Sequence, residues 1–168
     1  KYTFPNFKEG YCTDDNVRAL QLLVMLEESG NVTPDVQALA SCYASFINYA
    51  YIPEKCRFHN FMSFERTWLD EDGSDDCLGR TLLALAACVG RSRRDDLRHW
   101  AVDLFQMALP SVTKTTSPRA WALGLKAIHE YLRKMSGDRT VDLMRETLTD
   151  QLLVAYNQNC SDEWPWFE

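Results

Sequence analysis

The sequence predicts an all-α protein of three antiparallel helical hairpins, because a short phrase repeats, apolar residues recur at helical spacing, and helix start signals divide the chain. Residues 13–20 return in altered form as residues 75–82. In the two copies Asp14 precedes Arg18, and Asp76 precedes Arg80, by four residues, so each acid and its arginine share a helix face. The repeat indicates stacked hairpins whose acidic first turns lie on one rim.

The first hairpin is expected to join a helix over residues 14–29 to a helix that begins at Thr33 and Pro34. Gly30 can adopt the left-handed conformation that closes a helix. Threonine as the N-cap followed by proline at the first helical position is a specific start signal. The two helices are therefore expected to pack antiparallel to each other.

Residues 53–73 lose the helical period and are rich in aromatic residues. We expect a small insert there, either irregular or a β-hairpin. Two short strands are not stable alone in water, so the insert must pack on the helices. Its length makes it a candidate functional loop.

The second and third hairpins follow from similar signals. Pro110 is expected to close one helix, and Ser117 with Pro118 repeats the start signal of the first hairpin. The most uniformly apolar helix is the third, so we expect it to be the most buried. The four helices are expected over residues 74–90, 94–109, 121–135 and 138–157.

Composition limits the class of protein and its partners. The 168 residues suit a single helical domain over 1–168, and because the chain begins with Lys1 rather than methionine we expect a segment of a longer protein. The net charge of −6, from 18 basic and 24 acidic residues, argues against nucleic acid as a partner. No apolar run is long enough for a membrane span, so we expect no membrane partner.

The cysteines indicate a reducing compartment. Six are present, without a CxxC pair or zinc spacing, and several lie in apolar helical stretches where free cysteine behaves as a small hydrophobe. We therefore expect a cytoplasmic protein, although the even number leaves a disulfide framework open. No phosphate-binding loop or nucleophile elbow is present, so we expect no cofactor.

Two acidic groups are the catalytic candidates: Asp75 and Asp76, at the end of a run of five acids in residues 70–76, and Asp14 and Asp15. Carboxylates are also favoured at helix N-termini, which gives each group a purely structural alternative. Crowded carboxylates raise one another's pKa, as a general acid beside an ionised partner requires. An EF-hand is excluded because its spacing places Trp68 in the first ligand position; an irregular calcium site stays open, and we expect no metal.

Arginines and aromatic residues beside these acids are the candidates for substrate binding. Arg18 and Arg80 could orient the carboxylates or bind substrate hydroxyls, and exposed aromatic rings suit the apolar face of a sugar. The alternative for each aromatic residue is packing on the core. The aromatic candidates are Tyr11, Trp68, Trp164 and Trp166.

Residues 10–20, 60–64 and 73–80 together resemble a helical module of bacterial glycosyltransferase-like proteins, which is similar to the (α/α)6 toroids of six-hairpin glycosidases. The resemblance spans most of the chain. It implies that the three hairpins form part of an α/α toroid, with Arg80 and the acids Asp14, Asp15, Asp75 and Asp76 lining its central cleft. Three hairpins are half of such a ring, and a nucleotide-sugar-binding domain is absent.

The function expected from residues and resemblance together is carbohydrate binding or processing. Two alternatives stay open: a glycoside hydrolase-like toroid that uses paired carboxylates, and a non-catalytic helical interaction scaffold. Carbohydrate is the expected partner. Because a half-ring exposes its edge, we also expect either a homodimer or a second half of the toroid elsewhere in the chain.

Overall fold

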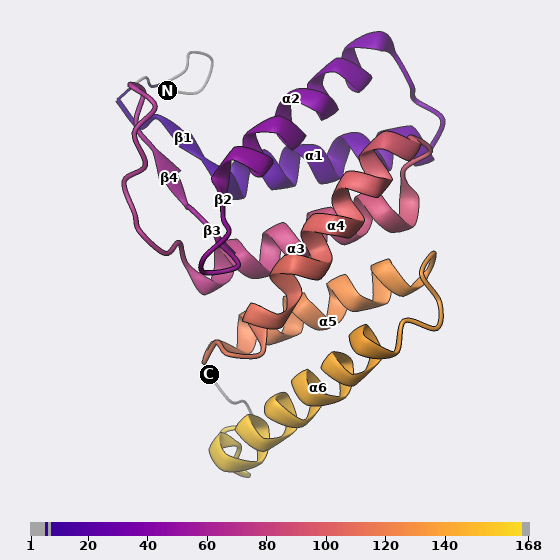
Figure 1. Ribbon diagram of the computed structural model, residues 1–168. Helices are drawn as coiled ribbons and strands as arrows, with labels where there is room; N and C mark the ends of the chain where they lie inside the picture. The colour runs from indigo at the N-terminus through magenta and orange to yellow at the C-terminus, as the bar shows by residue number, and fades with distance from the viewer. Residues whose placement is uncertain (1–5, 7, 166–168) are drawn as a thin grey trace.

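The computed structural model describes residue 6 and residues 8–165, and there its helices pair into antiparallel hairpins (Figure 1). The all-α prediction is confirmed. The helices are α1 (Thr13–Glu28), α2 (Pro34–Ala50), α3 (Asp75–Arg91), α4 (Asp95–Val112), α5 (Pro118–Leu132) and α6 (Arg139–Asn159).

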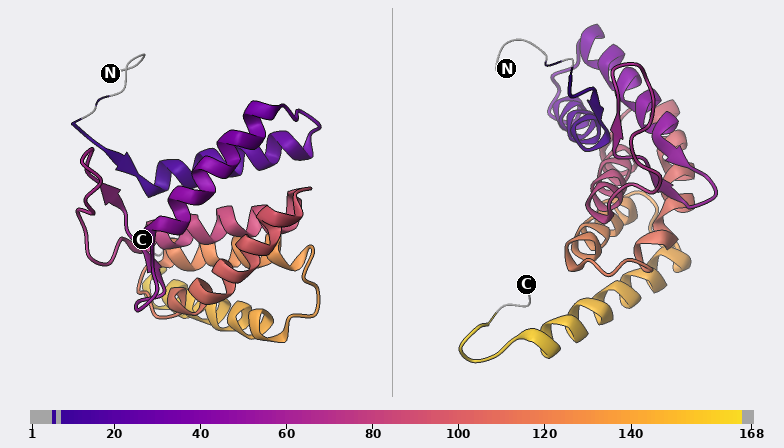
Figure 2. Two further views of the ribbon diagram at one scale, coloured as in Figure 1. Left: turned by 45° about the horizontal axis from the view of Figure 1, so that its top comes forward. Right: turned by 90° about the vertical axis from the view of Figure 1, so that its left-hand side faces the viewer.

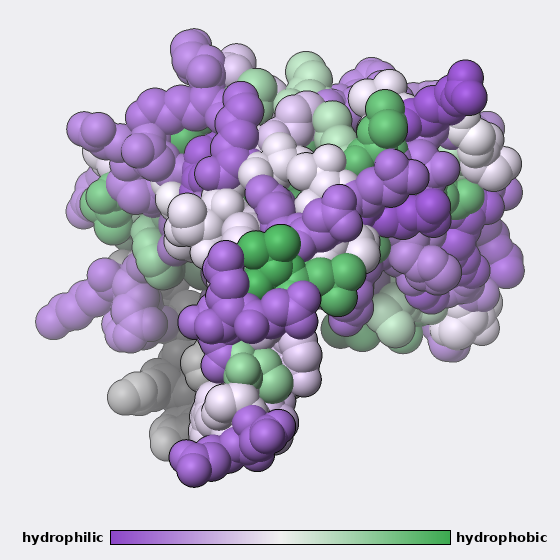
Figure 3. All heavy atoms as spheres, turned by 90° about the horizontal axis from the view of Figure 1, so that it is seen from below, coloured by the Kyte–Doolittle hydropathy of each residue, from purple (hydrophilic) through white to green (hydrophobic). Residues whose placement is uncertain are grey.

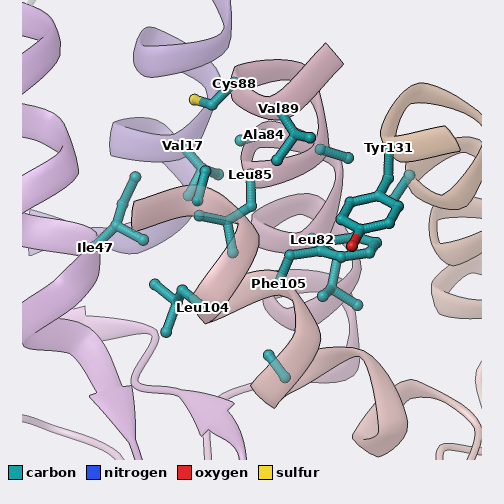
Figure 4. Packing of buried hydrophobic residues seen from close by; sticks show 14 of the residues in the cluster. Val17, Ile47, Leu82, Ala84, Leu85, Cys88, Val89, Leu104, Phe105 and Tyr131 are labelled. Carbon is teal, nitrogen blue, oxygen red and sulfur yellow. The ribbon is translucent and has the colours of Figure 1, made fainter. Parts of the chain in front are cut away.

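The first helices of the three hairpins, α1, α3 and α5, pack side by side in one layer, and α2 and α4 form a second layer on one side of it (Figure 2). Helix α3 is in the middle and packs against α1, α4 and α5. Its Leu82, Leu85 and Cys88 are completely buried, in a core that continues to Phe105 and Tyr131 (Figure 4). The expectation that the third helix is the most buried is therefore confirmed.

Side-chain caps explain why the helix starts were predictable. The hydroxyl oxygens of Thr33, Ser74 and Ser117 each accept a hydrogen bond from the backbone N–H three residues later, at 3.1–3.3 Å. Each cap satisfies a donor that the first helical turn leaves free. Because these bonds form within one turn of chain, the local sequence is enough to set them.

Three helix boundaries differ by three residues from those expected. Helix α4 runs through Pro110 to Val112 although the proline has no N–H to donate to the preceding turn, and the burial of Ser111 and Val112 offsets that loss. Helix α5 starts at Pro118 instead of residue 121 and ends at Leu132 instead of residue 135, since Ser117 caps it directly.

The insert predicted at residues 53–73 supplies one strand to a β-hairpin that begins just before it, at Tyr51, and one strand to a second pair that was not expected. Strand β2 (Tyr51–Ile52) pairs with β3 (Arg57–Phe58), with Tyr51 opposite Phe58. Strand β4 (Phe61–Met62) pairs with β1 (Tyr11–Cys12), which precedes α1. Both pairs lie at the end of the molecule where α1 and α3 begin (Figure 1).

Helix α6 forms the edge of the molecule and packs mainly on α5. Only Val141 and Leu148 of this helix are buried, whereas Leu143 and Leu153, which are also apolar, are 63% and 54% exposed. The difference arises because no further helix among the described residues covers its outer side.

Seen from below, the surface of the molecule shows apolar side chains among polar ones (Figure 3).

No helix in the described part of the chain combines the length and the apolar character that crossing a membrane requires.

Candidate functional site at the start of α1, α3 and α5

Four charged residues from three helices meet where these helices begin, and we call them the rim cluster: Asp14, Asp76, Arg80 and Arg119. The Nε atom of Arg80 lies 3.0 Å from Oδ1 of Asp14 and 2.8 Å from Oδ2 of Asp76. Arg119, in the first turn of α5, lies 4.0 Å from Asp76. The structure therefore brings the two predicted acidic turns to one rim.

The rim cluster is partly shielded from water. The side chains of Asp14 and Arg80 are 18% and 31% exposed, and the hydrogen bond that Arg80 donates to Asp76 raises the pKa of its guanidinium. Oδ1 of Asp14 and Oδ1 of Asp76 are each buried without a hydrogen bond of good geometry. Arg80 thus connects α1 to α3 as well as bonding within its own helix.

The ion pairs of Arg18, in contrast, are with acids of its own helix, α1. Arg18 forms ion pairs with Asp14 and with Asp15, the latter at 3.1 Å. The side chains of Asp15 and Arg18 are 73% and 55% exposed, so this part of the predicted site is a solvated helix surface.

The structure separates Asp75 from Asp76. Asp75 accepts a hydrogen bond at 2.8 Å from Arg57 of β3, which also donates to the carbonyl oxygens of Asp72 and Gly73. Asp76 joins the rim cluster instead. Asp75 therefore fastens the insert to the start of α3.

The other acids before α3 also hold the insert. The carboxylate of Asp70 accepts hydrogen bonds from the backbone N–H groups of Asn60, Phe61 and Gly73 at 2.7–2.9 Å. Asp72 pairs with Lys55. Among the described residues, no three His, Cys, Asp or Glu side chains gather as a metal site would require.

A group of aromatic rings beside the rim forms the second feature, and we call it the aromatic surface: Tyr11, Phe46, Tyr49, Phe64 and Trp68. Tyr11 stacks on Phe64 with ring centroids 6.1 Å apart. Trp68 lies between Tyr49 at 5.4 Å and His59, which stacks on it at 4.6 Å. Rings from β1, α2 and the insert thus form one continuous group.

Three rings of the aromatic surface, those of Tyr11, Phe46 and Tyr49, line a hollow of about 310 Å³ that is open to solvent. Tyr49, Phe64 and Tyr11 are 60%, 49% and 38% exposed. The hollow is lined by Tyr11, Ser45, Phe46, Tyr49, Met62 and Arg66.

Sequence reasoning identified Tyr11 and Trp68 but missed Phe46 and Tyr49. The spacing of three between Phe46 and Tyr49 places them on neighbouring positions of α2, so Tyr49 adds a second aromatic ring to this side of the helix. That extra aromatic residue is the signal that could have identified them.

Trp164 of the tail lies outside the aromatic surface. Its side chain is 60% exposed, and its backbone N–H donates to the Ser161 hydroxyl at 3.0 Å. Trp166 lies outside the described residues.

Asp76→Asn is expected to lower the free energy of unfolding by less than about 1 kcal/mol, because the Asp76 side chain is 37% exposed and such ion pairs contribute little. Chemical denaturation of the two proteins would measure the change. A loss of several kcal/mol would show that the rim cluster mainly serves the fold.

No family model matches the sequence, and a search of curated proteins finds no match. The chemistry of the rim cluster and the aromatic surface is therefore the basis for assigning a function.

Proposed function

We propose that the chain is a carbohydrate-binding helical module and that the aromatic surface receives the sugar. The observation that supports this most directly is the set of solvent-exposed rings around a hollow of about 310 Å³. A pyranose ring has an apolar face that stacks on aromatic rings and a polar edge that needs hydrogen bonds. Tyr11 and Tyr49 supply the rings, and Ser45 and Arg66 supply the polar groups.

The polar groups favour a sugar over a purely apolar ligand. The side chain of Arg66 forms no ion pair within the described part of the chain, and it lies in a turn after Phe64. An apolar ligand would cover this guanidinium without offering it a partner, which is costly. Sugar hydroxyls offer acceptors for it.

Binding is a better-supported activity than hydrolysis. Asp14 and Asp76 have a structural use, because both form ion pairs with Arg80 and so connect α1 to α3. We extend the proposal to carbohydrate processing by paired carboxylates, a reaction whose stereochemical outcome is set by the distance between the two carboxylates. This reaction would take place at the rim cluster, which lies at the same end of the molecule as the aromatic surface.

The proposal also includes a setting for the module. Three stacked hairpins would form part of an α/α toroid in a bacterial glycosyltransferase-like protein.

The buried cysteines bear on the compartment. Burial raises the pKa of the Cys77 and Cys88 thiols to about 12, so both stay protonated and unreactive at neutral pH. Unpaired buried thiols suit a cytoplasmic location.

Tyr49→Ala and Phe64→Ala are each expected to weaken carbohydrate binding about tenfold, or about 1.4 kcal/mol. Tyr49 lines the hollow and would stack on the sugar, and Phe64 stacks on Tyr11, which lines the hollow as well. Isothermal titration with gluco-, manno- and xylo-oligosaccharides would measure this. Both side chains are about half exposed, so folding should be preserved.

Leu143→Ala is the control, because this leucine is equally exposed but lies on α6. Unchanged affinity in both aromatic variants, or no binding of any oligosaccharide by the wild-type protein, would refute the proposal.

An interaction scaffold is the second candidate, and α6 is the observation that favours it. Leu143, Leu153 and Val154 are all more than half exposed on this edge helix. Apolar patches on soluble proteins are commonly sites of association. The partner would be a second copy of this chain or further hairpins of the same toroid.

A further inference from the structure

A second hollow, of about 380 Å³, lies between α2 and α4 and adjoins the first. Ser45 lines both hollows, so they meet across α2. The polar and aromatic residues that line the second one are Ser41, Ser45 and Asn48 of α2 with Arg94, Asp96 and Trp100 at the start of α4.

Hydrogen bonds between the two helices fix the side chains of this second hollow. Arg94 donates to the Gln37 carbonyl oxygen and to the Ser41 hydroxyl, both at 3.0 Å. Trp100 donates from Nε1 to Oδ1 of Asn48 at 3.0 Å. Side chains already fixed in this way lose little conformational entropy when a ligand binds, so the hollow is preorganised.

Several polar atoms in the hollow still have hydrogen-bonding capacity. The Asn48 Nδ2 group has no hydrogen-bond partner in the described part of the chain, since only its Oδ1 is used. The Asp96 side chain is 69% exposed, and each of its oxygens accepts one bond from Arg94 and can accept another. A donor and an acceptor that share one hollow match the adjacent hydroxyl groups of a sugar.

The charge of the hollow argues against an anionic ligand. Arg94 is paired with Asp96 through two hydrogen bonds, at 2.6 and 3.1 Å, so no net positive charge is left to attract a phosphate or a nucleotide. An apolar ligand would cover the Asn48 Nδ2 group and the remaining acceptor positions of Asp96 without offering them partners. A neutral ligand with several hydroxyl groups needs no net positive charge in the hollow, and its hydroxyl groups can bond to both Asn48 and Asp96.

We infer that the second hollow is a further subsite of the sugar-binding surface, so that the ligand is a neutral oligosaccharide that crosses α2. One part of the ligand stacks on the aromatic surface, and the next part bonds to Asn48 and Asp96 beside Trp100. This inference rests on the proposed function, and it adds that affinity depends on chain length.

The test is a titration of wild-type protein and Asn48→Ala with gluco-, manno- and xylo-oligosaccharides of one to six units. Wild-type affinity should rise with length by about tenfold or more, and Asn48→Ala should remove that rise while binding the shortest active sugar normally. Tyr49→Ala should instead weaken binding at every length. Asp96→Asn is the second variant, and melting temperatures confirm that each variant folds.

The outcomes separate the two proposals. If wild-type protein binds short and long sugars equally, or if Asn48→Ala and Asp96→Asn keep the full length dependence, the second subsite is wrong while the proposed function stands. If the wild-type protein binds none of these sugars, both proposals are wrong.

Discussion

Gly90→Ala is expected to lower the free energy of unfolding by about 1–3 kcal/mol, because α3 and α5 approach too closely at this point for a side chain. A Cβ atom on Gly90 would lie 2.4 Å from the carbonyl oxygen of Glu130. That oxygen belongs to the backbone of α5, so the two helices would have to separate. The cost should exceed the helix-propensity gain of about 1 kcal/mol from replacing glycine with alanine.

Urea denaturation would measure this loss, with Gly79→Ala as the matched control in the same helix. A Cβ atom on Gly79 would lie 3.0 Å from Cβ of Leu123, 3.1 Å from its Cδ1 and 3.3 Å from Cα of Ala120. These distances are longer than the 2.4 Å at Gly90, so a smaller movement of α5 is enough. We therefore expect a clearly smaller loss. If Gly90→Ala is as stable as the wild type, the close contact between α3 and α5 is wrong.

Arg91→Met is expected to cost about 1–3 kcal/mol at neutral pH, because Arg91 connects α1, α3 and α5 at the end opposite the rim cluster. Its guanidinium bonds to both carboxylate oxygens of Glu130, at 2.8 and 2.6 Å, and to Glu28 at 2.8 Å. The Glu130 side chain is 15% exposed, so losing Arg91 leaves a largely buried carboxylate with only Arg133 as its cationic partner.

The effect of Arg91→Met should depend on pH in a defined direction. The hydrogen bond from Arg91 lowers the pKa of Glu130 below its usual value of 4.5. A carboxylate with a lowered pKa in the folded state contributes its full stabilisation above the unfolded pKa and loses it as the pH falls through the folded pKa. The difference in melting temperature between wild type and variant should therefore shrink below about pH 4.5.

Arg145→Met is the control for this pH series, because Arg145 pairs with Asp142 at 3.0 Å and both side chains are 51% exposed. Such a surface pair should contribute less than about 1 kcal/mol at any pH. An equal difference between wild type and Arg91→Met at pH 7 and pH 3 would contradict the assigned role of the Glu130 pair.

The features that the sequence determined by itself are those made within one helical turn. The hydroxyl groups of Thr33 and Ser117 cap their helices by accepting a hydrogen bond from the backbone N–H three residues later. The ion pair between Asp76 and Arg80 spans four residues. These interactions depend only on helical geometry, so their spacing is visible in the chain. The apolar character of α3 likewise made its burial predictable.

Only the tertiary structure decided which residues from different elements meet. Nothing local shows that Arg80 contacts Asp14, or that Asp75 turns away from its neighbour to Arg57. The aromatic surface likewise exists because β4 pairs with β1, which brings rings from the insert beside those of α2. Such contacts depend on how the hairpins pack over long sequence separations, and the spacing of residues along one segment carries no information about that packing.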